Sequence, residues 1–347
     1  MSHFHTLSVK SINRQTPKAV QVFFEIPNDL NNAFKFEPGQ YITLETKIED
    51  ENIRRSYSIC TTPEEGLAVV VKAIDDGVFS NFANRKLKEG DKLEVMPPEG
   101  HFVINNQKED SNYCAFVAGS GITPVMSLVK SVLKRNSSSK FVLVYGNKSP
   151  EQTIFFNEIL ELQKDYPERL FVENIYSETQ EDNSLFGRIE KPTVNYVLKN
   201  KYKGVDFDEY LICGPEPMID NVQEVLKENG IAEDAIKYEL FYSEKDGEEI
   251  EHTDGKTKLT IIVDDEEHEL IMDQDEVILN AILEKDIDVP YSCQGGVCSS
   301  CLAQIKSGTA KMRKNQILTD EEVAQGLILT CQAQPQTPEV TVDYDDI

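Results

Sequence analysis

Four cysteines near the C-terminus have the residue type and the spacing to hold a metal cluster. Cys293, Cys298 and Cys301 follow the pattern C-x4-C-x2-C, and Cys331 stands further along the chain. This spacing is the plant-type ligand set of a [2Fe–2S] cluster, which is held by four thiolates. Two glycines between the first two cysteines allow backbone amides to approach the cluster sulfides. The pattern therefore predicts a [2Fe–2S] centre, which transfers one electron at a time.

A zinc site and disulfides are the alternatives for these cysteines. Structural zinc sites usually combine two C-x2-C pairs, whereas Cys298 and Cys301 form only one and no His lies near Cys331. The chain has seven cysteines, an odd number, and no apolar signal stretch at its N-terminus. These features favour a reducing compartment over a disulfide framework, and we expect a cytoplasmic protein.

Two turns in the middle of the chain have the residues to bind a nucleotide. Residues 118–124 (A-G-S-G-I-T-P) follow an apolar run and open a helical pattern, and residues 213–218 (C-G-P-E-P-M) follow a later apolar run. Glycines allow a pyrophosphate to approach, and the free amides at a helix N-terminus attract its charge. Ligands of open α/β sheets bind at the carboxyl ends of strands, so both turns are expected to meet one ligand. Cys213 equally fits a buried structural thiol.

The N-terminal third offers a third candidate, residues 54–58 (R-R-S-Y-S). Arg55 and Tyr57 share one face of a strand, where a cation and a ring can hold a phosphate and stack on a planar ring system. Residues 76–80 (D-G-V-F-S) form a turn in which Ser80 is placed to cap a helix over residues 81–87. Taken alone, each motif also fits an ordinary strand or helix cap.

Three sequence patterns divide the 347 residues that must position these motifs. Residues 1–107 contain short alternating runs separated by turns, which predict a small antiparallel barrel. Residues 108–242 alternate apolar strands with helical stretches, which predicts βαβ units on a parallel sheet. The polar, acidic residues 243–257 are typical of a linker. Residues 258–347 predict a four-stranded sheet crossed by one helix around the cysteine loop.

The charge of the chain limits its partners. A net charge of −26 argues against nucleic acid, whose phosphates would be repelled. No apolar run approaches the roughly 18 residues that a membrane span needs. From Glu244 onward there are 24 acidic and 8 basic residues, so the acidic excess is expected around the cluster. This excess either solvates the domain or forms a negative docking face for a basic partner.

In this order, the motifs resemble those of the ferredoxin–NADP reductase superfamily with a C-terminal plant-type ferredoxin domain. Residues 55–58 match the R-x-Y-S flavin motif, residues 119–124 the pyridine-nucleotide motif, and residues 213–215 the C-G-P motif. The whole chain is similar to the reductase subunits of phenylacetyl-CoA epoxidases. The resemblance implies an antiparallel flavin-binding β-barrel (1–107), a parallel α/β nucleotide-binding domain (108–242) and a β-grasp ferredoxin domain (258–347).

The resemblance also implies roles for individual residues. The FAD site would be lined by residues of the first domain: Arg55, Tyr57, Ser58, Val71, Lys72, Gly77, Phe79 and Ser80. The nicotinamide dinucleotide would be held by residues of the second domain: Gly119, Ser120, Gly121, Thr123, Cys213, Gly214 and Pro215. Ser58 near flavin N5 and Cys213 beside nicotinamide C4 would be the catalytic residues, and Phe241 would cover the flavin's nicotinamide face.

The implied activity is electron transfer from NAD(P)H through FAD and the [2Fe–2S] cluster to an oxygenase component. By resemblance, the acceptor is a di-iron phenylacetyl-CoA epoxidase in aromatic acid catabolism. The alternatives are the reductase of another ring hydroxylase or dioxygenase, and a redox carrier or sensor without catalysis. NADPH is the expected donor, with NADH as the alternative, because Glu178 stands where many NADP-using relatives carry Arg. Ser177, Lys148 and Arg188 are the remaining candidates to bind a 2′-phosphate.

Overall fold

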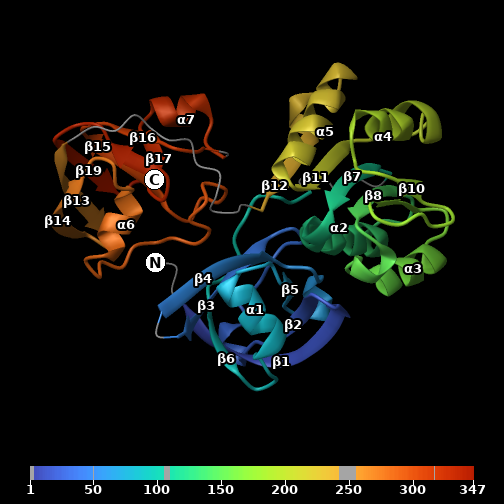
Figure 1. The fold of residues 1–347 in the computed structure, drawn as a ribbon, viewed down its shortest axis with the longest axis horizontal. Coiled ribbons are helices and arrows are strands. Elements are labelled where there is room, and N and C mark those ends of the chain that lie inside the picture. The colour runs from blue at the N-terminus through green and yellow to red at the C-terminus, as the bar shows by residue number, and fades with distance from the viewer. Residues whose placement is uncertain (1–3, 50, 105–109, 242–254, 316) are drawn as a thin grey trace. The chain divides into compact units, whose positions relative to one another are not determined.

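The structure is a computed structural model that describes residues 4–49, 51–104, 110–241, 255–315 and 317–347 (Figure 1). The chain forms two compact units, one over Phe4–Phe241 and one that includes Tyr242–Ile347. The predicted boundaries near residues 107 and 242, and most of the predicted 243–257 linker, lie outside the described residues. Among the described helices, none is both long and apolar enough to cross a membrane.

The first half of the larger unit is a six-stranded antiparallel barrel with the strand order β4-β3-β6-β1-β2-β5. Its strands are β1 (His5–Thr16), β2 (Ala19–Glu25), β3 (Tyr41–Ile48), β4 (Glu51–Ser58), β5 (Ala68–Lys72) and β6 (Lys92–Val95). An isolated antiparallel bridge between Ile59 and Val69 joins the two end strands and closes the barrel. The barrel is filled by apolar side chains such as Val22 and Leu44, and it confirms the predicted architecture.

One helix, α1 (Val78–Arg85), covers this barrel, and it starts earlier than the sequence predicts. The predicted cap at Ser80 is wrong, because the N-cap residue is Gly77 and Ser80 lies in the first turn. Phe79 is only 2 % exposed, so burying its ring in the barrel draws residues 78–80 into the helix. The Ser80 hydroxyl instead accepts from the amide of Ile74 and donates to the carbonyl of Gly77, both at 3.3 Å.

The second half of the larger unit is a six-stranded sheet in which every neighbouring pair is parallel, in the order β10-β9-β8-β7-β11-β12. Its strands are β7 (Tyr113–Ala118), β8 (Phe141–Asn147), β9 (Leu170–Tyr176), β10 (Leu185–Phe186), β11 (Glu209–Gly214) and β12 (Ile236–Leu240). The helices of this half are α2 (Ile122–Arg135), α3 (Phe156–Asp165), α4 (Lys191–Tyr196) and α5 (Glu216–Glu228). The predicted parallel α/β fold is confirmed, and its strand order reverses at β7, beside β11.

The C-terminal unit is built on a five-stranded mixed sheet with the order β14-β13-β19-β15-β17. Its strands are β13 (Lys256–Val263), β14 (Glu266–Asp273), β15 (Leu302–Ser307), β17 (Leu327–Leu329) and β19 (Glu339–Asp343). A two-stranded ribbon, β16 (Ala310–Met312) with β18 (Ala333–Pro335), and two helices, α6 (Ile278–Leu283) and α7 (Asp320–Ala324), complete it. The predicted sheet of four strands with one helix is too small, because the sheet has five strands. The sequence does not predict the ribbon of β16 and β18, since strands of three residues leave no alternation to detect.

Two local predictions in this unit can be compared with the structure. Residues 319–322 (T-D-E-E) predict a capping box from their sequence, and it is present at the start of α7: the Thr319 hydroxyl accepts from the amide of Glu322, and the Glu322 carboxylate accepts from the amide of Thr319. The predicted linker extends too far, because β13 already begins at Lys256.

Gly121 sets how closely α2 approaches the end of β11. A Cβ added there would lie 2.2 Å from the carbonyl oxygen of Cys213, far inside van der Waals contact. We predict that Gly121→Ala lowers the free energy of unfolding by about 2 to 3 kcal/mol, because the backbone of β11 must move. Urea denaturation measures the change. Gly204→Ala, at a position with no atom within 4 Å of the added Cβ, is the control. Equal losses in both variants would contradict this close packing.

Candidate functional site

The turn after β7 is held in place by buried hydroxyl groups. The Tyr145 hydroxyl donates to the carbonyls of Gly119 at 3.0 Å and of Ile154 at 3.3 Å. The Thr123 hydroxyl donates to the carbonyl of Ser120 at 3.0 Å, which ties the turn to the first residues of α2. Because Tyr145 and Thr123 are almost fully buried, the turn has a fixed backbone with its amides at the N-terminal end of α2.

The turn after β11 lies directly beside the turn after β7. The two strands are parallel neighbours, and Cys213 pairs with Val117. A Cβ on Gly214 would lie 2.7 Å from the Met218 methyl carbon and 3.2 Å from the amide nitrogen of Ala118. The structure thus brings together the two turns that the sequence singles out. Pro215 follows as the N-cap residue of α5, so a second helix also begins at this edge of the sheet.

A carboxylate joins the end of β4 in the barrel to the end of the parallel sheet. The Ser58 hydroxyl donates to Oε2 of Glu239 at 2.9 Å. Glu239 lies on β12, where it pairs in register with Cys213 of β11. Ser58, Cys213 and Glu239 therefore form one cluster, although they stand far apart in the sequence. Sequence reasoning missed Glu239, because an acidic residue in a short edge strand carries no motif of its own.

Burial controls the charge of this cluster. Glu239 as a residue keeps some exposure, but its carboxyl group lies beneath the surface, and burial raises its pKa to about 7 against the effect of the Ser58 hydrogen bond. Burial also raises the pKa of the Cys213 thiol well above its usual value, and the Glu239 charge adds to the shift. Cys213 is therefore a neutral thiol near neutral pH and is unsuited to act as a thiolate nucleophile.

Six of the eight predicted flavin residues lie on β4, which ends at Ser58, or at the start of α1, and the other two end β5. The Tyr57 ring packs against Phe79, with 5.5 Å between ring centroids, and burial raises the pKa of its hydroxyl despite the nearby Arg55 charge. The Arg55 guanidinium donates to the carbonyl of Arg54 at 2.7 Å. A cation and a ring therefore lie close together on β4, beside the Gly77 turn that precedes α1.

Lys72 extends from the barrel to the nucleotide turn. Its ammonium lies 3.3 Å from the position that a Cβ on Gly119 would occupy. Burial lowers the pKa of Lys72, and the charges of Lys148 and Lys18 lower it further. The carbonyl of Val71, one residue earlier, accepts from the Asn84 side chain at 2.9 Å. Phe241, directly after β12, has 39 % of its surface exposed at the same sheet edge.

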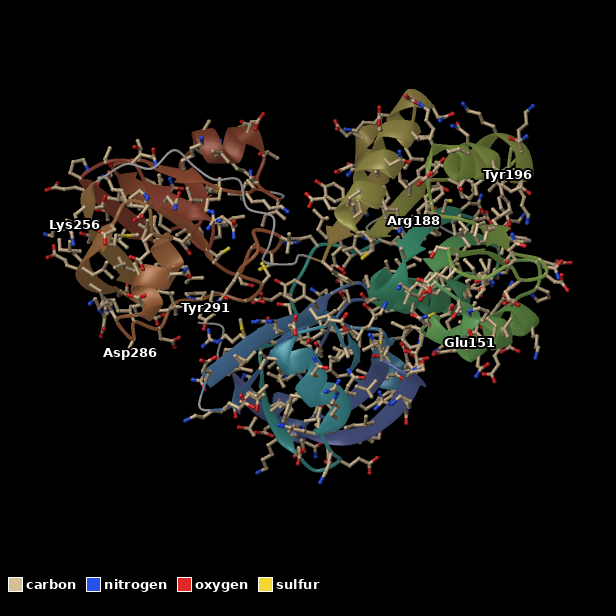
Figure 2. The ribbon with its side chains drawn as sticks, viewed as in Figure 1. Glu151, Arg188, Tyr196, Lys256, Asp286 and Tyr291 are labelled. Atoms are coloured by element: carbon tan, nitrogen blue, oxygen red, sulfur yellow. The ribbon has the colours of Figure 1, made fainter. Side chains whose placement is uncertain are left out.

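The residues expected to recognise the adenosine side of the dinucleotide follow the ends of β8, β9 and β10. Lys148 Nζ lies 2.9 Å from Glu178 Oε1, and both side chains are more than half exposed. The amide of Ser177 donates to the carbonyl of Asn147 at 3.0 Å. Arg188, which is labelled in Figure 2, follows β10 and is exposed. The negative charge of Glu178 is thus offset by a neighbouring cation that belongs to the same sheet edge.

The four cysteines of the C-terminal unit lie close together as free thiols. The Cys293 thiol is within hydrogen-bonding reach of the Cys298 and Cys331 thiols, and Cys331 also contacts Cys301. The amide of Gly295 donates to the Cys293 sulfur at 3.3 Å. Thiols in contact, with an amide directed at one of them, fit the donor set of a [2Fe–2S] cluster.

The loops that carry these thiols have their own support. The Tyr344 hydroxyl donates to the Thr330 hydroxyl at 2.8 Å, which in turn donates to the Cys301 carbonyl at 3.1 Å. Gly296 adopts a positive φ of 71°, and a Cβ there would lie 2.9 Å from the Gln332 side chain, so the loop packs closely on the strand after Cys331. Within the described ranges, no group of three or more His, Cys, Asp or Glu side chains is spaced to hold a single metal ion.

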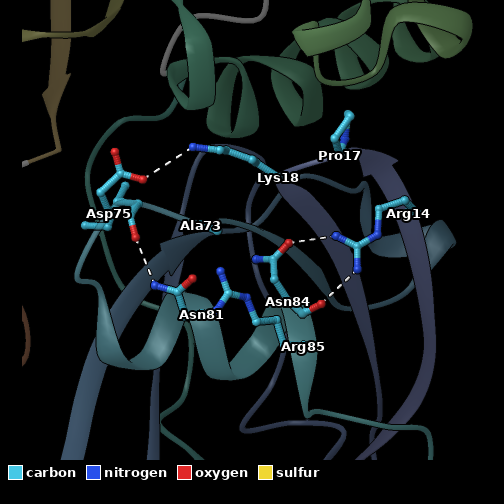
Figure 3. A pocket seen from close by; sticks show the side chains of 9 residues that line it. Arg14, Pro17, Lys18, Ala73, Asp75, Asn81, Asn84 and Arg85 are labelled. Carbon is cyan, nitrogen blue, oxygen red and sulfur yellow. Dashed lines mark hydrogen bonds and ion pairs between the residues drawn. The ribbon is translucent and has the colours of Figure 1, made fainter.

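A separate cavity of about 170 Å³ lies on the barrel between the β1–β2 turn and α1 (Figure 3). It is lined by Arg14, Pro17, Lys18, Ala73, Ile74, Asp75, Asn81, Asn84 and Arg85. Most of its polar groups bind one another: Arg14 donates to the Asn84 side chain at 2.9 Å, and Lys18 lies 3.3 Å from Asp75. It contains none of the predicted site residues and has no evident part in the cluster around Ser58.

Comparison with known proteins identifies three domains in the chain. Residues 7–104 match the oxidoreductase FAD-binding domain, residues 116–224 the oxidoreductase NAD-binding domain, and residues 261–336 the 2Fe-2S iron-sulfur cluster binding domain. The chain is 36% identical to a 1,2-phenylacetyl-CoA epoxidase subunit of Escherichia coli over 99% of both chains. It is 31% identical to the ferredoxin reductase component of the 3-ketosteroid-9-alpha-monooxygenase of Rhodococcus rhodochrous, over 97% of this chain and 96% of the relative.

The fold is that of phthalate dioxygenase reductase, which aligns with a TM-score of 0.64 and 21% identity over 98% of both chains. The three domain matches confirm the cofactor types expected from the sequence: FAD, a nicotinamide dinucleotide and [2Fe–2S]. The individual ligand and contact residues stay predictions.

The raised pKa of Glu239 makes stability depend on pH. Between about pH 4.5 and 7 the folded chain keeps a proton that the unfolded chain releases, so stability falls as the pH rises through this range. We predict that Glu239→Gln removes this dependence, which amounts to at most about 3 kcal/mol. Urea denaturation of flavin-free protein at several pH values measures it.

Glu224→Gln, an exposed carboxylate on α5, is the matched control and should leave the pH dependence unchanged. A wild-type protein with the same pH profile as Glu239→Gln would show that Glu239 titrates normally.

Proposed function

The chain belongs to the FAD- and [2Fe–2S]-containing oxygenase reductases of the ferredoxin–NADP reductase superfamily, and from this premise we propose that it transfers electrons from NADPH to an oxygenase component. The observation that carries the proposal is the hydrogen bond between Ser58 and Glu239. This bond joins the end of the flavin-motif strand to a residue in register with Cys213. A flavin held at the first motif and a nicotinamide held at the second would therefore lie next to each other.

The chain's own residues position the bound groups. When bound, FAD accepts a hydride and releases its two electrons singly, and the [2Fe–2S] cluster carries them one at a time. We infer that Arg55 and the amides at Gly77, Phe79 and Ser80 bind the FAD diphosphate. Tyr57 stacks on the flavin, since its ring is already fixed against Phe79. Val71 and Lys72 line the same site.

Glu239 is proposed to fix the orientation of the Ser58 hydroxyl group. Its Oε2 accepts a hydrogen bond from the Ser58 hydroxyl, which would leave the lone pairs of Ser58 free for the flavin. A carboxyl group with a pKa of about 7 can also hold a proton itself near neutral pH. The neutral, buried Cys213 excludes water beside the nicotinamide ring, and Phe241 covers the flavin where the nicotinamide is absent.

The turn after β7 is proposed to bind the dinucleotide phosphates through residues 119–123, with residues 213–215 on its nicotinamide side. NADPH is the proposed donor, because Lys148, Ser177 and Arg188 can contact a 2′-phosphate. The negative charge of Glu178 repels this phosphate, and Glu178 forms an ion pair with Lys148. NADH, which lacks the 2′-phosphate, is therefore also accepted, at lower efficiency.

The proposed cluster ligands are Cys293, Cys298, Cys301 and Cys331. The proposed acceptor is the oxygenase component of a phenylacetyl-CoA epoxidase, supported by the relative that is 36% identical over the full chain. The second candidate is the oxygenase of a ring-hydroxylating system, supported by the steroid monooxygenase relative. The seven free cysteines suit a reducing compartment, and we place the protein in the cytoplasm.

Removing one thiol separates the two halves of the electron path. We predict that Cys331→Ser loses the cluster but keeps NADPH–ferricyanide activity, because ferricyanide takes electrons from the flavin. Iron content, the visible spectrum and electron delivery to the oxygenase component are measured together. Cys114→Ala, which removes a buried thiol of the other unit, should keep the cluster. A Cys331→Ser protein with wild-type iron would refute the ligand assignment. Wild-type protein that binds iron but never flavin would favour the non-catalytic carrier.

Glu178 should limit the preference for NADPH. We predict that Glu178→Ala raises the ratio of kcat/KM for NADPH to that for NADH on the order of tenfold, a change of about 1.4 kcal/mol, because the repelling charge is removed and Lys148 is released. Glu181→Ala, an exposed carboxylate three residues further on, is the control. An unchanged ratio in Glu178→Ala would place the 2′-phosphate elsewhere.

A further inference from the structure

The charged residues of the C-terminal unit are unevenly distributed. The unit is acidic as a whole, but the segment that carries three of the cluster cysteines is basic. Residues 289–319, which include three of the four cluster cysteines, contain four basic and no acidic residues. Residues 323–338, around Cys331, contain no charged residue at all. Acidic residues are therefore absent from the two segments that carry the cysteines, and they adjoin these segments instead.

The acidic residues lie in other parts of the unit. They occupy the β13–β14 hairpin and the turn after it (residues 264–276), the segment after α6 (284–288), the first turn of α7 (320–322), the start of β19 (Glu339) and the C-terminus (343–346). Two lysines outside the cysteine segments pair with acids of the β13–β14 hairpin: Lys256 lies 3.5 Å from Asp273, and Lys258 lies 2.5 Å from Glu269. Lys306, inside the first segment, lies 3.7 Å from Asp343. In Figure 2, Lys256 lies on the side of the unit away from Tyr291, which starts the cysteine loop.

Three cations, Lys311, Arg313 and Lys314, form a basic segment that contacts the cysteine loops. The amide of Arg313 donates to the carbonyl of Gln332, next to Cys331, at 2.8 Å. The carbonyl of Lys314 lies 3.1 Å from the position that a Cβ on Gly296 would take. β16 carries Lys311 and pairs with β18, two residues beyond Cys331. The basic segment is therefore fixed beside the proposed ligands.

The surface at this place has the composition of a docking site. Lys311 is exposed, Arg313 and Lys314 are partly exposed, and neither Lys311 nor Arg313 forms an ion pair with a described residue. Ile317, three residues beyond Lys314 in the sequence, is 38 % exposed. Cys293 is the only one of the four proposed ligands that is not fully buried. Positive charge, an exposed apolar side chain and the most accessible ligand thus occur on neighbouring segments.

We propose that the basic segment with Ile317 is the docking surface for the electron acceptor, and that the acceptor is a protein presenting carboxylates to it. Interfaces commonly surround apolar contacts with polar groups, and opposite charges increase the rate of encounter. An acceptor with a basic face would instead be repelled at the position where an electron leaves. This inference rests on the proposed function, because it assumes a protein acceptor.

The test reverses the charges at this surface in the full holoprotein. Lys311→Glu/Arg313→Glu is compared with Lys256→Glu/Lys285→Glu, which changes the net charge equally at positions outside the basic segment. Both variants should keep the wild-type flavin and iron contents. After reduction, the EPR signal of the cluster is followed during oxidation by iron(III)–EDTA, an anion, and by hexaamminecobalt(III), a cation. The anion-to-cation rate ratio should fall by about fivefold or more in the first variant only.

The same variants are then assayed with the oxygenase component of a phenylacetyl-CoA epoxidase. In Lys311→Glu/Arg313→Glu, kcat/KM for this acceptor should fall by about fivefold or more and lose its dependence on salt, with the control unchanged. The docking surface would be overturned if the anion-to-cation rate ratio of Lys311→Glu/Arg313→Glu stayed unchanged. It would also be overturned if this ratio fell while kcat/KM for the oxygenase stayed unchanged. If the wild-type protein cannot reduce this oxygenase, the proposed acceptor is wrong. The anion-to-cation rate ratio measured with the two metal complexes then decides alone whether the basic segment is the docking surface.

Discussion

The hydrogen bond from Ser58 to Glu239 requires the barrel and the parallel sheet to keep a fixed distance, since a shift of about 1 Å would break it. Other contacts maintain this distance. One apolar core joins Ala68 and Val70 of β5 to Val125 of α2, so both halves of the larger unit share buried surface. The amide of Gly39 in the barrel donates to the Ser127 hydroxyl of α2 at 2.9 Å. The position of the site is therefore set by packing on both sides of it.

A buried ion network fixes the same interface at a second point. Lys130 of α2 is only 4 % exposed and lies 2.9 Å from Glu65 of the barrel and 2.8 Å from Glu158 of α3. Burial alone would lower the pKa of Lys130, but Glu158 and Glu65 raise it above its usual value, so the cation stays charged. Loss of one partner would leave a buried charge uncompensated. This lowers the free energy of unfolding more than replacing all the charged groups with apolar ones would. The network therefore favours one orientation of the two halves.

The sequence predicts the parts of the site that depend on local pattern. The turns after β7 and β11 are detectable because glycine and proline directly follow strands that are apolar throughout. Glu239 is different, since its role arises only when β12 pairs beside β11 and β4 ends opposite it. The start of α1 also differs from the prediction, because burial of Phe79 outweighs the preference of Ser80 for a cap position. Long-range packing decides both cases, and a single sequence does not specify it.

The distribution of charge in the C-terminal unit fits the demands of electron transfer. A cluster held by the four cysteines would have its most accessible edge at Cys293. A contact with an electron acceptor must form and dissociate quickly, which argues against a large apolar interface there. A few cations beside one exposed Ile supply attraction at long range with little buried area. The acids elsewhere on the unit then keep it solvated without covering this edge.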